Sequence, residues 1–276
     1  MENATRVVVV TGATSGIGLA AAEAFARAGD RVAVVGRDPA RLDSALSRVR
    51  EAAPPGAPEP TGFRADFAVL DEVRQLAAEL RDAYPKIDVL ANNAGALFPR
   101  RVTTVDGFEL TMQANHLAPF LLTNLLRDKV TRVITTASRG HQQGRLDPDD
   151  LSSAKQTYVP LFVYGSSKQA NILFAAESAR RWPDVLSTSY HPGVVRTRYG
   201  HDTPLIAWYY RVGPFLRTPQ KGAETLIWLA DEPADRIVNG AYYVDRRVRR
   251  PWQRARDPEL AARLWEASLV ATGLAG

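Results

Sequence analysis

The chain has 276 residues and a mass of 30.3 kDa, with 45% hydrophobic and 24% charged residues. This composition is ordinary for a globular protein with a sizeable core, and the length suits a single α/β domain over residues 1–276. The absence of cysteine excludes disulfides, thiolate nucleophiles and cysteine-ligated metals. The sequence has no run of about 18 apolar residues, so we expect no membrane-spanning helix. The N-terminus also lacks the pattern of a secretory signal, so we expect a cytoplasmic protein.

The net charge of +5 is unevenly placed along the chain. Arginines crowd residues 246–256, within the predicted C-terminal extension over residues 245–276: Arg246, Arg247, Arg249, Arg250, Arg254 and Arg256. Such a cluster is either a patch for an acidic partner or a solvated surface segment. No nucleic-acid-binding motif accompanies it, so we favour the solvated segment and expect no nucleic-acid partner.

Apolar stretches of strand length alternate with amphipathic stretches of helix length from the N-terminus onward. Residues 6–11 and 31–36 are rich in valine and predict strands that are buried on both faces. Residues 17–28 predict a helix that stops before a glycine. Residues 39–52 predict a second helix, which Asp38 is placed to cap.

The same alternation continues toward the C-terminus. The further expected strands are residues 61–66, 87–92, 131–137, 185–190 and 241–244, and the further expected helices are residues 70–83, 107–127, 161–181, 220–230 and 258–272. Residues 141–160 and 191–217 read as irregular segments. A βαβ series of this kind predicts a doubly wound parallel sheet, the Rossmann fold, with helices on both faces.

The first predicted strand runs directly into a glycine-rich turn that opens a helix. Glycines there let the backbone approach a pyrophosphate, and the helix N-terminus supplies N–H groups and positive dipole. A lone glycine-rich turn is a weak signal, but this one lies where a dinucleotide site is expected. The candidate cofactor contacts in this turn are Gly12, Thr14, Ser15, Gly16, Ile17 and Gly18.

The end of the second predicted strand, Val35-Gly36-Arg37-Asp38, bears on the choice of cofactor. An acid at this strand end binds the 2′-hydroxyl of an NAD ribose, whereas an arginine receives the 2′-phosphate of NADP. In this sequence Gly36 occupies the position at which we would expect the acid of an NAD-binding site, and Arg37 comes directly after it. The sequence therefore favours NADP(H). Asp38 is the alternative ribose ligand, although its place before Pro39 also suits a helix cap.

Tyr164 and Lys168 are four residues apart and so share one face of the helix predicted over residues 161–181. A free tyrosine has a pKa of about 10, and a neighbouring ammonium favours the phenolate and lowers that pKa. Tyr164 could then exchange a proton with a substrate oxygen. In isolation, this spacing is more typical of a surface pair.

The pair belongs to an ordered set of motifs. In chain order these are TGATSGIG (residues 11–18), Asp66-Phe67, Asn92-Asn93-Ala94-Gly95, Asn115, Ser138, Tyr164 with Lys168, and Pro192-Gly193 with Thr197. The set resembles the short-chain dehydrogenase/reductase family over nearly the whole chain. The interval from Ser138 to Tyr164 and the run HPGVVRT are most similar to the retinol-dehydrogenase-like branch, and residues 239–265 are similar to its bacterial members.

The resemblance implies a role for each matching residue. Tyr164 would be the general acid in reduction and the general base in oxidation. Lys168 would lower the pKa of Tyr164 and bind the nicotinamide ribose, and Ser138 would donate a hydrogen bond to the substrate oxygen. Asn115 would hold a water that links Lys168 to solvent. The remaining implied cofactor contacts are Asp66 and Phe67 near the adenine, Asn93, Ala94 and Gly95 along the cleft, and Pro192, Gly193, Val195 and Thr197 at the nicotinamide.

Some residues depart from the family pattern or fall outside it. Thr136-Ala137-Ser138 stands where a paired serine is more usual, and Ala118-Pro119 where glycine is common. His141 and His191 lie near the motifs, but a lone histidine is more often a packed residue than a catalyst. No cluster has metal-ligand spacing, so we expect no metal.

Residues 196–217 are rich in apolar and aromatic side chains and form the candidate substrate loop. They predict a lid over an apolar or aromatic small molecule. The alternative is that Ile206–Val212 is a short helix packed on the core or at a subunit contact. Cations that could steer an acidic substrate there are Arg196, Arg198, His201 and Arg211. Many members of the family pair into homodimers or homotetramers through the helices that correspond to residues 107–127 and 161–181, but the retinol-dehydrogenase-like branch varies, so the resemblance leaves the oligomeric state open.

The predicted function is NADP(H)-dependent hydride transfer between the nicotinamide and a ketone, aldehyde or secondary alcohol. Two alternatives stay open. The same site could reduce an imine or alkene, or carry out an isomerisation or elimination, and product analysis would distinguish these. A non-catalytic dinucleotide-sensing module would have no need of the set Asn115, Ser138, Tyr164 and Lys168.

Overall fold

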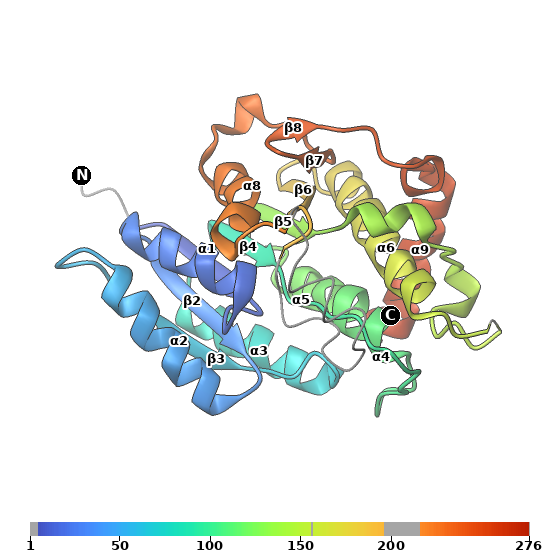
Figure 1. Ribbon diagram of the computed structural model, residues 1–276, viewed down its shortest axis with the longest axis horizontal. Coiled ribbons are helices and arrows are strands. Elements are labelled where there is room, and N and C mark those ends of the chain that lie inside the picture. The colour runs from blue at the N-terminus through green and yellow to red at the C-terminus, as the bar shows by residue number, and fades with distance from the viewer. Residues whose placement is uncertain (1–4, 156, 196–215, 276) are drawn as a thin grey trace.

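A computed structural model of the protein describes residues 5–155, 157–195 and 216–275. Within them, one eight-stranded sheet has the order β3-β2-β1-β4-β5-β6-β7-β8 (Figure 1). The strands are β1 (Val7–Thr11), β2 (Arg31–Gly36), β3 (Thr61–Arg64), β4 (Val89–Asn92), β5 (Arg132–Thr136), β6 (Leu186–His191), β7 (Tyr242–Val244) and β8 (Arg247–Val248). All neighbours pair in parallel except β7 and β8. The strand order reverses between β1 and β4, where sheets of this kind bind ligands.

Helices cover both faces of the sheet (Figure 1). They are α1 (Gly16–Arg27), α2 (Pro39–Ala52), α3 (Leu70–Ala83), α4 (Leu110–Met112), α5 (Ala118–Leu125), α6 (Pro160–Arg181), α8 (Pro219–Asp231) and α9 (Pro258–Ala271). The predicted doubly wound Rossmann fold is confirmed. No helix in the described ranges is long and apolar enough to cross a membrane.

The valine run of β1 shows why this sequence forms an interior strand. Successive side chains of a strand point to opposite faces. Val8 and Val10 pack in the core beneath α1 and α8, whereas Val7 and Val9 pack in the core beneath α3 and α5. Both faces are therefore buried, which accounts for the lack of polar alternation in the sequence.

The C-terminal helix α9 is held to the rest of the molecule by an aromatic cluster. The ring of Trp265 on α9 lies 5.0 Å from that of Phe120 on α5 and 5.8 Å from that of Phe174 on α6, measured between centroids. All three residues are buried. The C-terminal extension is thus anchored against α5 and α6.

Two local features differ from the sequence-based expectation. The helix expected over residues 107–127 begins only at Leu110, passes through a π-helical turn at Gln113–Leu117 and ends at Leu125. β8 was not expected, because a two-residue strand with exposed side chains carries no periodic pattern. The irregular segment 141–160 also contains a 3-10 turn at Pro148–Asp150, and another at Arg139–Gln143 overlaps its start.

We predict that Trp265→Ala lowers the free energy of unfolding by about 3–5 kcal/mol, because it empties the centre of the aromatic cluster. Val270→Ala, on the exposed side of the same helix, should change it by less than about 0.5 kcal/mol. Urea unfolding monitored by circular dichroism measures both. Equal effects of the two substitutions would show that the cluster does not anchor α9.

Candidate functional site

The turn after β1 packs directly on the turn after β4. Gly12 has a φ of 64°, and a Cβ there would lie 2.8 Å from the Ala94 Cα. The Thr11 hydroxyl accepts hydrogen bonds from the backbone N–H groups of Asn93 and Ala94, both at 3.0 Å. Only glycine permits this approach, and it leaves a floor without a side chain at position 12 where the two turns meet.

The first turn of α1 presents backbone donors beside this floor. Ser15 occupies the N-cap position but makes no capping hydrogen bond through its side chain, and the first turn contains no acidic residue. A Cβ on Gly18 would lie 2.4 Å from the Gly12 carbonyl oxygen. Free N–H groups and positive helix dipole beside a side-chain-free floor fit a dinucleotide pyrophosphate.

At the end of β2, Asp38 is used in a helix cap, whereas the Arg37 side chain is exposed. An Asp38 carboxylate oxygen accepts a hydrogen bond from the Arg41 backbone N–H at 2.9 Å and so caps α2, as its sequence position indicates. Arg37 is exposed. Gly36 lies against Thr14, and a Cβ at position 36 would be 2.2 Å from the Thr14 Cγ2. Position 36 therefore has no room for an acidic side chain unless Thr14 changes.

Asp66 and Phe67 follow β3 but face different surroundings. The Asp66 carboxylate accepts a hydrogen bond from the Ala68 backbone N–H at 3.0 Å, which orders the turn that precedes α3. Phe67 is buried in the core between the sheet and α3. A role for Phe67 toward a cofactor would therefore be to support the turn.

The four predicted catalytic residues come from three segments that meet at the carboxyl ends of β4 and β5. Asn115 lies in the π-helical turn, Ser138 follows β5, and Tyr164 and Lys168 lie on α6. The Asn115 side chain accepts from the Ala96 N–H at 2.7 Å and donates to the Ala96 carbonyl at 2.9 Å. Widened helical turns of this type often occur at functional sites.

Lys168 is buried, with 3% of its surface exposed. Its Nζ donates a hydrogen bond to the Thr136 carbonyl oxygen at 3.0 Å and lies 5.6 Å from the centroid of the Tyr164 ring. Burial lowers the pKa of Lys168 to about 8. The spacing of Tyr164 and Lys168 therefore does not mark a surface pair.

Two glycines leave space around these side chains. A Cβ on Gly95 would lie 3.0 Å from the Asn115 Oδ1 and 3.3 Å from the Lys168 Nζ, so both polar atoms face one point. A Cβ on Gly140 would lie 3.2 Å from the Tyr164 ring and 3.5 Å from the Ser138 Oγ. Gly140, which belongs to none of the sequence motifs, therefore lies between the serine and the tyrosine.

Ser138 begins a short turn that places its hydroxyl. The Oγ accepts a hydrogen bond from the Gly140 N–H at 3.1 Å, which leaves the hydroxyl hydrogen available for an external acceptor. The Ser138 carbonyl oxygen is 2.6 Å from the Nδ1 of His141, whose Nε2 accepts the Trp252 backbone N–H at 3.0 Å. His141 thus ties the serine turn to the arginine-rich segment.

Both histidines near the motifs are buried. Burial and a nearby backbone carbonyl act on His141, and burial dominates to lower its pKa. Burial, reinforced by the charges of Arg139 and Arg217, lowers the pKa of His191 to about 4. His191 is therefore neutral near pH 7, and the two hydrogen bonds of His141 give that residue a positioning role.

The segment after β6 continues from the strand that lies next to β5 in the sheet. Gly193 has a φ of 85° and lies against the Arg217 side chain. The backbone of Val195 pairs with that of Arg217, whose guanidinium binds the carboxylate of Asp245 at 2.5 and 3.1 Å. Thr197 and almost all of the predicted substrate loop lie outside the described residues.

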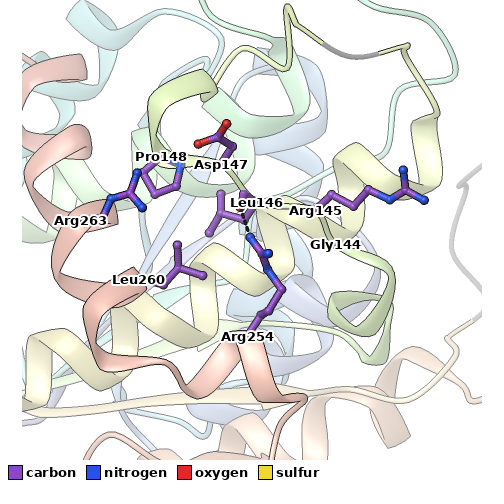
Figure 2. A pocket seen from close by; sticks show the side chains of 8 residues that line it. All are labelled: Gly144, Arg145, Leu146, Asp147, Pro148, Arg254, Leu260 and Arg263. Atoms are coloured by element: carbon purple, nitrogen blue, oxygen red, sulfur yellow. Dashed lines mark hydrogen bonds between the residues drawn. The ribbon is translucent and has the colours of Figure 1, made fainter.

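A hollow of about 370 Å³ lies apart from the four predicted catalytic residues. Figure 2 shows its lining between the segment before α6 and the start of α9: Gly144, Arg145, Leu146, Asp147, Pro148, Arg254, Leu260 and Arg263. Arg254 donates to the Leu146 carbonyl oxygen at 2.8 Å, and Arg263 binds Asp149 at 2.6 Å. These arginines hold α9 and the preceding turn in place.

Comparison with known proteins agrees with this geometry. A family profile described as short chain dehydrogenase matches residues 6–204. A protein of Streptomyces sp. (strain C5) named "Putative daunorubicin C-13 ketoreductase DnrU" is 54% identical over 97% of this chain and 93% of its own. Human retinol dehydrogenase 14 is 37% identical over 98% of this chain and 87% of its own.

Solved structures have the same fold. A crystal structure of an uncharacterized protein from Mycobacterium paratuberculosis has a TM-score of 0.78 and 31% identity, and the match covers 97% of this chain and 93% of the other. An alcohol dehydrogenase from Thermococcus sibiricus, complexed with 5-hydroxy-NADP, has a TM-score of 0.66 and 22% identity over 85% and 94% of the two chains. The chain belongs to the short-chain dehydrogenase family and to its retinol-dehydrogenase-like branch.

Proposed function

We propose that the protein is an NADP(H)-dependent oxidoreductase that interconverts a ketone or aldehyde and the corresponding alcohol of an apolar or aromatic small molecule. The observation that carries this proposal is the buried Lys168 ammonium beneath the Tyr164 ring. A buried charge without an ionic partner opposes folding, and such arrangements cluster at functional sites. The names of the ketoreductase and retinol dehydrogenase relatives support this reaction class.

The end of β2 supports NADP(H) over NAD(H). An acid that could bind the ribose 2′-hydroxyl has no room at position 36, because the Thr14 methyl group fills that space. The Asp38 carboxylate is used as the cap of α2. Arg37 is left exposed at the strand end, where a guanidinium suits a phosphate dianion.

When bound, NADP(H) supplies or accepts the hydride, and the chain supplies position and protons. Tyr164 would donate a proton to the substrate oxygen in reduction and remove it in oxidation. Ser138 would donate its hydroxyl hydrogen to the same oxygen, since its Oγ already accepts from Gly140. The Lys168 ammonium would stabilise negative charge on the Tyr164 oxygen.

Asn115 and Lys168 form the proposed proton relay. Their Oδ1 and Nζ atoms converge on the space that Gly95 leaves open, at 3.0 and 3.3 Å from its Cβ position. A water held between these two atoms would accept from Lys168 and donate to Asn115. The π-helical turn would serve the relay by bringing the Asn115 amide to this point.

We predict that Tyr164→Phe lowers kcat for NADPH-dependent carbonyl reduction by a factor of about 10²–10⁴ and leaves the Kd for NADPH within about twofold. The substitution removes the proton donor and retains the ring. Tyr84→Phe is the matched control, because the Tyr84 hydroxyl is buried without a described partner beneath α3, away from the site. Steady-state assays over a carbonyl panel measure both, and full activity of Tyr164→Phe would contradict the assignment.

We also predict that Gly36→Asp alone weakens binding of both NADPH and NADH, because its Cβ would collide with Thr14. The double variant Thr14→Ala/Gly36→Asp removes the colliding methyl group and should bind NADH more tightly than Gly36→Asp does. Thr14→Ala alone is the control for loss of the threonine. Titration of intrinsic fluorescence gives the dissociation constants. Tight NADH binding by Gly36→Asp alone would show that the contact with Thr14 does not restrict this position.

A further inference from the structure

The carboxyl ends of β2 and β3 place two arginines side by side. Gly36 pairs with Arg64 in the parallel register, and Arg37 follows directly after Gly36. The Arg64 Nε donates a hydrogen bond to the Arg37 carbonyl oxygen at 3.3 Å. This hydrogen bond holds the Arg64 guanidinium at the strand end from which Arg37 also extends. Arg64 belongs to none of the sequence motifs.

The carboxylates nearest in sequence to these two arginines are committed to backbone groups. Asp38 accepts from the Arg41 N–H, and Asp66 accepts from the Ala68 N–H. Among the residues that the structure describes, neither Arg37 nor Arg64 makes an ion pair, and both are exposed. Two like charges at adjacent strand ends repel each other unless an anion lies between them.

We propose that Arg64 is a second specificity-determining residue, which binds the 2′-phosphate of NADP(H) together with Arg37. This inference rests on the proposed cofactor preference and adds a residue to it. A phosphate dianion accepts hydrogen bonds from two guanidinium groups at once. Because the hydrogen bond to the Arg37 carbonyl already restricts Arg64, less side-chain freedom is lost on binding than for an unrestrained arginine.

Arg31, at the start of β2, provides a matched control for Arg64. It is also exposed and also lacks an ion pair among the described residues, but it begins β2, whereas Arg37 follows the end of that strand. Arg31→Gln and Arg64→Gln therefore remove the same charge from opposite ends of the sheet. A general effect of net charge on a polyanionic ligand would appear in both variants, whereas a contact with the 2′-phosphate would appear only in Arg64→Gln.

The test is a titration of wild type, Arg64→Gln, Arg37→Gln and Arg31→Gln with NADPH, NADH and 2′,5′-ADP at fixed ionic strength. We expect Arg64→Gln to raise the dissociation constants of NADPH and 2′,5′-ADP about tenfold and to leave that of NADH within about twofold. Arg31→Gln should change none of these three dissociation constants. Thermal unfolding of each variant without ligand checks that the fold is intact.

The possible failures are distinguishable. If wild type prefers NADPH but Arg64→Gln weakens NADPH and NADH equally or not at all, the role of Arg64 is wrong and the proposed cofactor preference stands. An equal loss in Arg31→Gln would also overturn the role of Arg64, because it would reflect net charge alone. If wild type binds NADH as tightly as NADPH, the cofactor preference fails and this inference fails with it.

Discussion

The burial of the Lys168 ammonium is the constraint on which the rest of the site depends. A charge removed from water is costly unless it is paired, and the one acceptor that the structure describes for this group is the Thr136 carbonyl oxygen. The resulting fall in the pKa of Lys168 to about 8 corresponds to roughly 3 kcal/mol of lost stability at neutral pH. A fold retains such a group only where surrounding elements hold it in place.

Those surrounding elements are the ends of parallel strands and the helices that follow them. β5 ends at Thr136 and supplies the carbonyl acceptor, while α6 carries Tyr164 and Lys168 one turn apart. Gly95, in the loop after β4, has no side chain to fill the space above the amine. The amine thus lies among neutral polar groups, including the Thr136 carbonyl oxygen and the Asn115 amide.

The parts of the structure with strong local signals could be predicted from the sequence. The valine-rich strands, the glycine turn after β1 and the Asp38 cap each depend on residues within a few positions of one another. The sheet order then follows from the βαβ pattern and the handedness of its crossovers. Asn115, Ser138, Tyr164 and Lys168 were found because they form an ordered set, and the structure brings them to one edge of the sheet.

Other features depend on contacts between distant segments and could not be predicted. The π-helical turn at Gln113–Leu117 accompanies the hydrogen bonds between the Asn115 amide and Ala96. The link from Ser138 through His141 to the Trp252 backbone spans more than a hundred residues. Arg64 lies beside Arg37 only because β2 and β3 pair in parallel. In each case the sequence contains the residue, but its importance comes from the partner.

The measurement that tests the central claim most directly is the stability of Lys168→Met as a function of pH. An apolar side chain of similar length removes the buried charge, so urea unfolding at pH 7 should show the variant to be more stable than wild type by roughly 2–3 kcal/mol, although it should be inactive. The penalty on wild type is complete below the folded-state pKa of about 8 and is relieved as pH rises toward the unfolded-state pKa of 10.5. The difference should therefore fall to about half by about pH 9.5. A variant less stable than wild type at pH 7, or a difference independent of pH, would contradict the claim that the fold gives up stability to hold this charge.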